Sequence, residues 1–500
     1  QATNLRTDAW GGDYSHRMRL PVEILARMRE AVGPDFIIIY RLSMIDLVPG
    51  GSAWDEIVTL GKAVATGGAN IVNTGIGWHE ARVPTIATSV PRAAFAWVTQ
   101  KMKAEFAAAG IATPLVTSNR INTPEVAEQV LADGCADMVS MARPLLADAA
   151  FVKKAAQGRA DRINTCIACN QACLDHVFQN KTSSCLVNPR ACHETELVLT
   201  PTSQPKRVAV VGAGPAGLAC ATVAASRGHK VTLFDAADEI GGQFNVAKQV
   251  PGKEEFYETL RYFEHEIQRL GIELRLNTTP DINTLSVFDH VVVATGVTPR
   301  RSGIEGENSS KVVDYIEALR SPRFVGERVA IVGAGPLGFD MAELLSHHKA
   351  DDGSVAAFDR EWGIDPKREQ RGGIKASERA DSPRQIWLLQ RSKAAMGSSL
   401  PTTTGWIRRT RLKNKSARMF NDVEYIHIDD NGLHLRIRGE QRCLSVDNIV
   451  VCAGQQSHDP WSSRLQAHNI AHTVIGGARN AHKIDAARAI EEGAELGRKL

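Results

Sequence analysis

Four cysteines lie close together in the sequence with a spacing that can hold a metal centre. Cys166, Cys169, Cys173 and Cys185 form the pattern C-x2-C-x3-C-x11-C. Thiolates are soft ligands, and three on one tight loop with a fourth further on is the arrangement of an iron–sulfur cluster. Structural zinc more usually shows two C-x2-C pairs. The pattern therefore favours an iron–sulfur cluster over zinc and over unrelated buried thiols, with Cys192 as an alternative fourth ligand.

The other four cysteines show no metal-binding spacing. Cys135, Cys220, Cys443 and Cys452 lie in apolar segments, and we predict that they are core residues. Nine cysteines in 500 residues are too few for a secreted disulfide scaffold. We therefore expect free thiols, a reducing compartment and a cytoplasmic protein.

A glycine-rich turn lies between an apolar strand and a helix in the middle of the chain. A predicted strand at Val208–Val211 leads into the turn Gly212-Ala-Gly214-Pro-Ala-Gly217 and a helix at Leu218–Arg227. A second strand at Lys230–Phe234 follows and ends in the acid Asp235. The glycines allow a tight turn and the close approach of a pyrophosphate, which the free N–H groups of the helix N-terminus would bind. Asp235 would accept hydrogen bonds from ribose hydroxyls. Five features in this order predict a dinucleotide-binding fold.

The same stretch is apolar enough to imitate a membrane span. Residues 208–226 carry no charged side chain. Gly212, Gly214, Pro215 and Gly217 lie inside it, however, and this composition breaks a continuous helix. We therefore predict a buried strand, a turn and a buried helix here, and no membrane span.

A second turn of the same kind follows the apolar strand Val329–Val332. Its glycines are Gly333, Gly335 and Gly338. The next predicted strand, Gln385–Leu389, ends in Gln390-Arg391-Ser392-Lys393, so cations stand where the first fold has an acid. This exchange favours a ribose 2′-phosphate bound by Arg391, and hence NADPH over NADH.

The overall charge gives no reason to expect a polyanionic partner. Lys and Arg total 59 against 56 Asp and Glu, a formal net charge of +3. Residues 391–418 contain eight Lys or Arg and no acid. Because this run adjoins a nucleotide-binding fold, cofactor phosphates or a solvated face are favoured over nucleic acid.

Residues 1 to about 150 alternate short apolar runs with segments long enough for helices. The predicted strands are Phe36–Ile39, Ala69–Asn73, Pro114–Thr117 and Asp137–Met141, and the predicted helices include Pro21–Val32 and Pro124–Ala132. Repeated β-α units predict an α/β fold, either a parallel sheet or a (β/α)8 barrel. Four strands are half of the number that such a barrel needs.

Composition and motifs divide the chain into five segments. They are a partial barrel at 1–160, the cysteine segment with a linker at 161–205, the first dinucleotide fold at 206–325, the second at 326–445, and a return to the first at 446–500. Ala350–Ser382 is polar, Gly-rich and charged, so we predict a surface insertion there and not a core element.

With these features in place, the chain resembles the bacterial NADPH-dependent 2,4-dienoyl-CoA reductases. More broadly, it is similar to Old Yellow Enzyme barrels fused to a disulfide-reductase-like module, as in trimethylamine dehydrogenase. The resemblance extends over nearly all 500 residues. Besides the four cysteines it rests on residues 4–12 (NLRTDAWGG), 75–82 (GIGWHEAR), 117–122 (TSNRIN), 140–144 (SMARP), 239–244 (EIGGQF) and 403–407 (TTGWI).

The resemblance implies the C-terminal half of a TIM barrel, an iron–sulfur loop and two Rossmann-like domains, with four cofactors. FMN in the barrel would be held by Arg41, Arg120, Ala142 and Arg143. The four cysteines would hold a 4Fe–4S cluster. FAD would bind the first dinucleotide fold through Ala216, Asp235, Gln243 and Lys253. NADPH would bind the second fold. Arg120 and Arg143 each follow a predicted strand, at the end where barrels bind phosphate, so the pattern agrees.

The resemblance also implies a reaction on an acyl-CoA thioester. NADPH would reduce FAD, the cluster would relay single electrons to FMN, and FMN would reduce 2,4-dienoyl-CoA to enoyl-CoA in β-oxidation of unsaturated fatty acids. His79 would be catalytic, as the partner of a proton-donating Tyr that the family places just upstream of Asn4. Neither that Tyr nor four further barrel strands are present, so we expect the C-terminal three-quarters of a larger reductase.

Two alternative functions stay open. One is a related amine dehydrogenase or demethylase that uses the same electron path in reverse, and the other is a non-catalytic NADPH-dependent electron-transfer module. Two positions depart from the family pattern, since Arg408 stands in place of His and Arg479 in place of Asp. The oligomeric state is open, and a monomer is compatible with the sequence.

Overall fold

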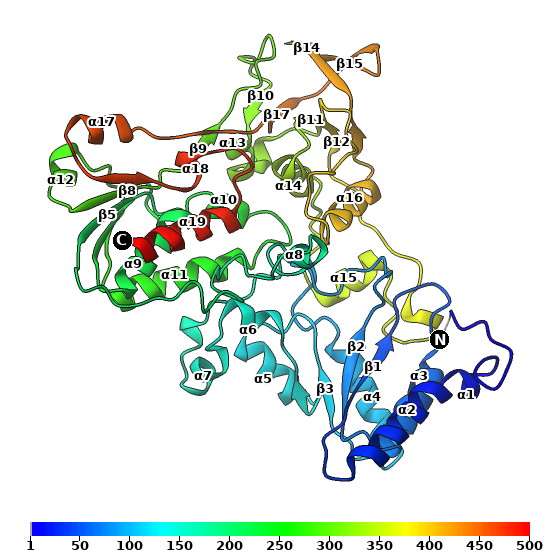
Figure 1. Ribbon diagram of the computed structural model, residues 1–500. Helices are drawn as coiled ribbons and strands as arrows, with labels where there is room; N and C mark the ends of the chain where they lie inside the picture. Colours follow the sequence, from blue (N-terminus) through cyan, green and yellow to red (C-terminus); the bar gives the residue numbers. More distant parts are fainter. Residues whose placement is uncertain (1–2) are drawn as a thin grey trace. The chain divides into compact units, whose positions relative to one another are not determined.

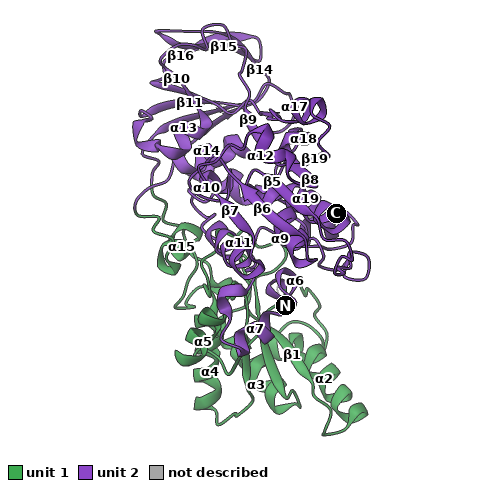
Figure 2. Ribbon diagram, turned by 90° about the vertical axis from the view of Figure 1, so that its left-hand side faces the viewer, with its two compact units in different colours: residues 1–142, 350–380 green, residues 143–349, 381–500 purple. Residues whose placement is uncertain are grey.

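The computed structural model describes residues 3–500, which form two compact units (Figure 2). The first unit contains the chain up to residue 142 together with residues 350–380, and the second contains residues 143–349 and 381–500. The chain therefore passes between the units three times. Both units combine parallel sheets with helices, so the predicted α/β class is confirmed.

The first unit contains a parallel four-stranded sheet with helices between its strands. The strands pair in chain order as β1 (Ile39–Ile45), β2 (Ile71–Ile76), β3 (Leu115–Thr117) and β4 (Met138–Val139). The helices include α1 (Tyr14–Arg17), α2 (Arg19–Val32), α3 (Trp54–Thr66), α4 (Ala96–Ala108) and α5 (Pro124–Ala132). All four predicted strands are present, and this alternation is that of half a (β/α)8 barrel.

The first strand begins later than predicted. Phe36 is 61% exposed, and the pairing of β1 with β2 begins at Ile39, opposite Ile71. Within β1 the side chains alternate, so Leu42 is buried while Arg41 is exposed on the opposite face. The apolar run predicts that a strand lies here. The first residue of the strand depends on backbone pairing with β2, which the apolar pattern does not encode.

The prediction of a purely surface insertion after residue 350 is wrong. Residues 350–380 belong to the first unit, where helix α15 (Val355–Trp362) buries Phe358. The ring of Phe358 meets that of Phe95 edge to face, with centroids 6.3 Å apart. Ile364, just beyond the helix, is completely buried. The prediction was wrong because it rested on the overall polar composition of the segment, although a few of its apolar residues pack into the core.

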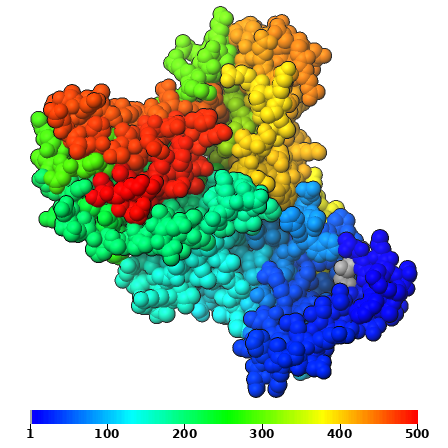
Figure 3. Space-filling view, viewed as in Figure 1, coloured from blue at the N-terminus to red at the C-terminus, as the bar shows by residue number. Residues whose placement is uncertain are grey.

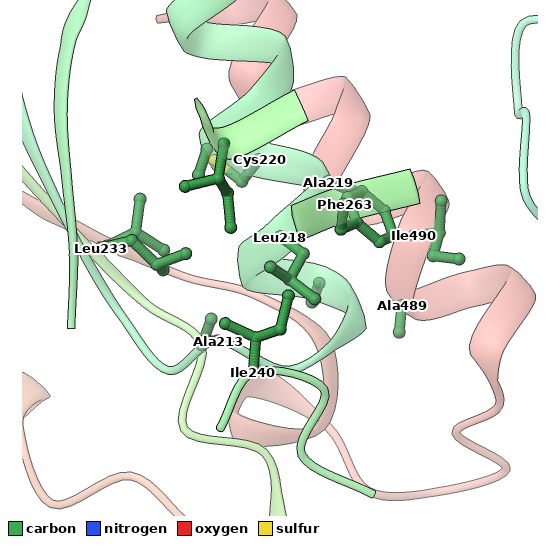
Figure 4. Packing of buried hydrophobic residues seen from close by; sticks show 14 of the residues in the cluster. Ala213, Leu218, Ala219, Cys220, Leu233, Ile240, Phe263, Ala489 and Ile490 are labelled. Atoms are coloured by element: carbon green, nitrogen blue, oxygen red, sulfur yellow. The ribbon is translucent and has the colours of Figure 1, made fainter. Parts of the chain in front are cut away.

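The first dinucleotide fold lies in the second unit. Its five parallel strands pair in the order β19 (His472–Val474), β8 (His290–Val293), β5 (Arg207–Val211), β6 (Lys230–Phe234) and β7 (Glu273–Arg275). Its main helices are α9 (Pro215–Ser226), α11 (Phe256–Leu270) and α19 (Ala486–Lys499) (Figure 1). Leu218 and Cys220 of α9 pack with Leu233 of β6 and Ile490 of α19 (Figure 4). The uncharged stretch is thus a strand, a turn and a helix, as predicted.

The second dinucleotide fold repeats this plan. Its parallel strands pair in the order β10 (Val312–Asp314), β17 (Asn448–Val451), β11 (Arg328–Val332), β12 (Gln385–Leu389) and β13 (Arg418–Phe420). The accompanying helices are α13 (Tyr315–Arg320), α14 (Pro336–Leu345) and α16 (Gly405–Asn414). An antiparallel pair joins β9 (Val297–Pro299), which follows β8, to β18 (Gln455–Ser457), which follows β17. Across residues 3–500, no helix combines the length and apolarity needed to cross a membrane.

A three-stranded antiparallel sheet extends the second fold. Its strands are β14 (Val423–Asp429), β15 (Gly432–Ile437) and β16 (Glu440–Leu444). Cys443 lies on the edge strand β16 and is exposed, so the prediction that it is a core residue is wrong. Cys135 is only half-buried, whereas Cys220 and Cys452 are buried as predicted. Residues 440–443 of β16 are all exposed, because this strand lies at the edge of the sheet and little packs over it.

The cysteine segment has little regular structure. Its α-helix within residues 161–205 is the short α8 (Leu174–Phe178), and two further short helices, α6 (Arg143–Ala147) and α7 (Phe151–Ala156), precede the segment. Ile167, Leu186 and Val187 of this segment belong to the same buried cluster as Val208 of β5 and Leu218 of α9. The cysteine segment is therefore part of the core of the first dinucleotide fold.

Candidate cofactor sites

The four cysteines that the sequence predicts as metal ligands line one pocket in the second unit. Cys166, Cys169, Cys173 and Cys185 share it with Arg143, Leu146, Ile167, Asn170, Ala172 and Leu186. Burial raises the pKa of Cys169 well above its ordinary value and that of Cys185 to about 12, and the neighbouring thiols add to both shifts. Such thiols stay protonated unless a cation replaces the proton. The donor set fits a thiolate-bound metal centre.

The four sulfur atoms are spread too widely for a single ion. No three of these Sγ atoms lie within 4.8 Å of one another. Sulfur ligands of one tetrahedral zinc ion, bound at about 2.3 Å, lie roughly 3.8 Å apart. Cys192, the alternative fourth ligand, is exposed and does not line the pocket. The four thiols are therefore not arranged as the closed shell of one zinc ion.

Arg143 lies beside the cysteines. Its Nη1 donates to Asn170 Oδ1 at 2.6 Å. Burial raises the pKa of Cys173, and the charge of Arg143 acts against that rise. A guanidinium group next to thiolates stabilises their negative charge. The FMN-binding roles of Arg143 and of the exposed Ala142 stay predictions.

The first glycine-rich turn has the shape that a pyrophosphate requires. A Cβ atom on Gly217 would lie 1.8 Å from the carbonyl oxygen of Gly212, so only glycine fits there. At Gly214 no protein atom lies within 4 Å of such a Cβ. This open space is at the N-terminus of α9, where free N–H groups favour an anion. Asp235 Oδ2 accepts a hydrogen bond from the N–H of Ala213 at 2.6 Å, which attaches the acid to the turn.

The remaining residues predicted to hold FAD have protein partners in the second unit. Ala216 is buried in the first turn of α9. Gln243 Oε1 accepts a hydrogen bond from Gln455 Nε2 at 2.9 Å. Lys253 Nζ lies 2.7 Å from Asp340 Oδ2, on α14 of the second dinucleotide fold. Contact of these three residues with FAD stays a prediction.

The second dinucleotide fold carries a cavity of about 370 Å³ with three arginines in its wall. The lining residues are Arg300, Arg301, Ser302, Val332, Gly333, Arg391, Tyr425, Cys452 and Ala453. Arg391 is the residue that the sequence predicts for a 2′-phosphate. Arg300 and Arg301 were missed, although two consecutive arginines directly after an apolar strand are a usable signal. Guanidinium groups match phosphate both in charge and in bidentate hydrogen bonding.

The second glycine-rich turn opens onto the same cavity. A Cβ atom on Gly338 would lie 1.8 Å from the carbonyl oxygen of Gly333, whereas one on Gly335 would meet no protein atom within 4 Å. Gly333 itself lines the arginine cavity. Open backbone at a helix N-terminus and a cationic wall together fit a phosphorylated dinucleotide.

Both departures from the family pattern have partners in the structure. Arg408, whose side chain is 14% exposed, pairs with Asp340 and Glu343 of α14. Burial raises the pKa of Asp340, but the nearby cations, Arg408 first, outweigh it and hold that pKa below its ordinary value. Arg479 Nη2 lies 2.6 Å from Glu492 Oε1 on α19. Each arginine thus forms an ion pair within the second unit.

In the first unit, the residues predicted to bind flavin lie on or just after the strands. Arg120 is buried with φ +54°, and its Nε donates to a backbone carbonyl at 2.7 Å. Arg41 is exposed on β1, and His79 is exposed in the loop after β2. Asn73 Oδ1 and Thr117 Oγ1 are buried and make no hydrogen bond within the described chain. Buried polar atoms of this kind fit a polar ligand, and the residue roles stay predictions.

Known families match both parts of this arrangement. Residues 206–478 match the pyridine nucleotide-disulphide oxidoreductase family, and residues 1–162 match the NADH:flavin oxidoreductase / NADH oxidase family. The chain belongs to the pyridine nucleotide-disulphide oxidoreductases. It is a flavin-dependent oxidoreductase whose dinucleotide folds take a flavin and a nicotinamide cofactor.

Relatives of this oxidoreductase carry the names of different substrates. It is 35% identical over 489 residues to a metal reductase of Desulforamulus reducens. The aligned region covers 96% of this chain and 71% of that protein. It is 36% identical over 358 residues to an NADH oxidase of Thermoanaerobacter brockii, covering 70% of this chain and 54% of the relative. A structure of 2-naphthoyl-CoA reductase in complex with 2-naphthoyl-CoA matches with a TM-score of 0.88 at 29% identity, over 100% of this chain and 70% of that one. The chain thus spans between about half and seven-tenths of these proteins.

Proposed function

We propose that this chain is the reductase part of an iron–sulfur flavoenzyme that uses NADPH to reduce a 2,4-dienoyl-CoA thioester. The observation that carries the proposal is the core shared by the cysteine pocket and the first dinucleotide fold. Cys166 and Leu186 belong to the same buried cluster as Val210 and Leu218. Because protein interiors are close-packed, a shared core holds two redox sites at a fixed separation.

When bound, NADPH, two flavins and a 4Fe–4S cluster would supply hydride and single-electron chemistry. The chain's own residues bind and orient these groups. Arg300, Arg301 and Arg391 would bind the 2′-phosphate, and the open backbone at Gly214 and Gly335 would admit the pyrophosphates. The four cysteines would ligate the cluster, while Arg143 would offset part of its negative charge.

The thioester acceptor is supported by the family motifs and by the likeness to 2-naphthoyl-CoA reductase. In this proposal His79, exposed in the loop after β2, assists proton delivery to the reduced thioester. The relative named metal reductase favours a second candidate, in which a metal ion is the electron acceptor.

The test uses the full chain purified without oxygen. Iron and acid-labile sulfide in equal amounts, with FMN and FAD, are the expected contents, and zinc with one flavin would contradict the cluster. NADPH oxidation is then followed with a dienoyl-CoA and with ferric citrate as electron acceptors, and NADP⁺ reduction is followed with a methylated amine as electron donor. Turnover with the dienoyl-CoA supports the proposal. Turnover with ferric citrate alone would make a metal ion the electron acceptor, and NADP⁺ reduction by the amine alone would make the chain an amine dehydrogenase. Reduction of an artificial dye without any of the three would identify an electron-transfer module.

A further inference from the structure

Four side chains with metal-binding chemistry meet on the outer face of the sheet β14–β16. His427 and Asp429 lie on β14, His434 on β15 and Cys443 on β16. In the sheet register His427 lies opposite His434, and His434 lies opposite Cys443. Residues directly opposite each other on antiparallel strands have Cβ atoms about 4.5–5.5 Å apart on the same face. One row across three strands therefore carries two imidazoles and a thiol.

A β-bulge turns the β14 residues toward this face. The pairing of β14 with β15 shifts between Tyr425 and His427. Val423 and Ile428 are both buried, although strand alternation would place residues five positions apart on opposite faces. The extra residue at the bulge restores Ile428 to the core, and it thereby places His427 and Asp429 on the outer face.

The distances between these side chains are close to those of a coordination shell. His434 Nε2 lies 3.0 Å from Asp429 Oδ1 and 3.5 Å from Cys443 Sγ, and His427 Nε2 lies 3.7 Å from Asp429 Oδ2. Ligand atoms around a tetrahedral zinc ion, at bond lengths of about 2.0–2.3 Å, lie roughly 3.3–3.6 Å apart. The two imidazole rings are nearly parallel, with centroids 4.1 Å apart. His427, Asp429 and His434 each offer a ligand atom within 4.8 Å of the other two, whereas Cys443 stands outside this group, so its side chain must rotate to bring Sγ to the same ion.

We propose that His427, Asp429, His434 and Cys443 bind one divalent transition-metal ion, for which zinc is the best match. Two imidazoles, a carboxylate and a thiolate are ligand types that zinc takes in proteins. Calcium and magnesium prefer oxygen ligands, which this set largely lacks. The neighbouring row on the same face holds Glu424 and Arg436, which form an ion pair with each other.

The site is accessible without rearrangement of the fold. The side chains of His427 and Asp429 are 37% exposed, that of His434 is 19% exposed, and Cys443 is exposed. The segment β14–β16, orange in Figure 3, lies at the molecular surface. Its ligands are separate from the four cysteines of the pocket, so each site can be tested without altering the other.

Zinc titration of the full chain with its cofactors tests the proposal. After exposure to a chelator, the chain should take up one zinc ion in competition with a chelating dye. The double variant His427→Ala with His434→Ala should weaken this uptake by more than about 100-fold, which exceeds the effect of losing a ligand's hydrogen-bond partner. His468→Ala, which removes an exposed imidazole of the same unit, should leave it unchanged. Equal zinc affinity in the wild type and the double variant would overturn the proposal, provided that flavin content shows both to be folded.

X-ray absorption at the zinc edge identifies the ligands despite the colour of the flavins. One sulfur with nitrogen and oxygen ligands is expected, and Cys443→Ser should remove the sulfur. A shell of four sulfurs would place the zinc on Cys166, Cys169, Cys173 and Cys185 and would overturn the proposal. A shell without sulfur in the wild type would overturn the four-ligand set.

Discussion

Asp175 and Thr403 connect the cysteine segment to the second dinucleotide fold. The backbone N–H of Thr403 donates to Asp175 Oδ1 at 2.8 Å, and Asp175 is only 3% exposed. Asp175 lies on α8, two residues after Cys173, and Thr403 lies just before α16. One buried carboxylate thus joins the segment with the proposed cluster ligands to the fold with the proposed NADPH residues.

Asp175→Ala should destabilise the chain by about 1.5–3 kcal/mol, the usual contribution of a hydrogen bond to a charged group. Thr403→Ala is the matched control, because the bond uses its backbone N–H, and its Oγ1 makes no hydrogen bond within the described chain. Urea unfolding of both variants measures the difference. Equal losses of unfolding free energy would show that this hydrogen bond is not the cause.

Gly214→Ala should weaken FAD binding about 10–100-fold without destabilising the apoprotein. The new Cβ would enter space that is free of protein atoms and that the pyrophosphate would occupy, and overpacking typically costs about 1–3 kcal/mol. A φ of −77° at this position suits alanine. Gly217→Ala should lower both flavin content and apoprotein Tm, because its Cβ would overlap the oxygen of Gly212. Wild-type FAD affinity in Gly214→Ala would show that the pyrophosphate binds elsewhere.

Arg391→Ala should raise the KM for NADPH by about 10–100-fold and leave the KM for NADH nearly unchanged. The reason is loss of one charge-assisted hydrogen bond to the 2′-phosphate, worth about 1.5–3 kcal/mol. Arg442→Ala, which removes an exposed ion pair with Glu440, is the control and should change neither KM. Steady-state rates with both nucleotides check this, and equal effects on the two would contradict a 2′-phosphate role.

Cys169→Ala should remove most of the iron from the anaerobically purified chain, since a cluster ligand is lost. Cys192→Ala should retain wild-type iron, because Cys192 is exposed and does not line the pocket. Iron and sulfide analysis of the two variants gives the comparison. Loss of iron in Cys192→Ala with retention in Cys169→Ala would show that Cys192, and not Cys169, is a cluster ligand.

The ion pair of Asp340 and Arg408 should make stability depend on acid pH. The pKa of Asp340 lies below its ordinary value because the nearby cations outweigh its burial. A carboxylate with a depressed pKa stabilises the fold above its unfolded pKa, about 3.9, and this contribution is lost as pH falls through the folded pKa. Arg408→Met should raise the pKa of Asp340, so the loss should begin at higher pH.

In that variant the unfolding free energy at pH 7 should also fall by about 1.5–3 kcal/mol, because Asp340 keeps only Lys253 as an ion-pair partner and Glu343 loses Arg408. Denaturant unfolding between pH 3 and 8 measures both effects. Arg479→Met, which removes a 60% exposed partner of Glu492, is the control and should show neither. An unchanged pH profile in Arg408→Met would contradict the assignment.

The parts of this molecule that sequence alone could predict are those with local causes. The turn at Gly212 and Gly217 is recognisable because the backbone conformation and the lack of a Cβ are properties of the residues themselves. The strand Lys230–Phe234 was predicted with both of its ends correct, because its β-branched, apolar and aromatic residues lie between Gly228 and Asp235, which mark its two ends. The cysteine pocket was predictable because three of its ligands lie within eight residues of one loop.

The sequence therefore determined the α/β class, the two nucleotide turns and the cysteine centre. Tertiary structure alone decided that Lys253 pairs with Asp340, that Phe358 enters the core of the first unit, and that Cys443 lies beside His434. The first two contacts join residues distant in the chain, the third joins neighbouring strands, and all three depend on strand register, a bulge or packing between elements. Residue types along the chain do not encode such pairings, because a shift of one residue in register moves every side chain to the other face.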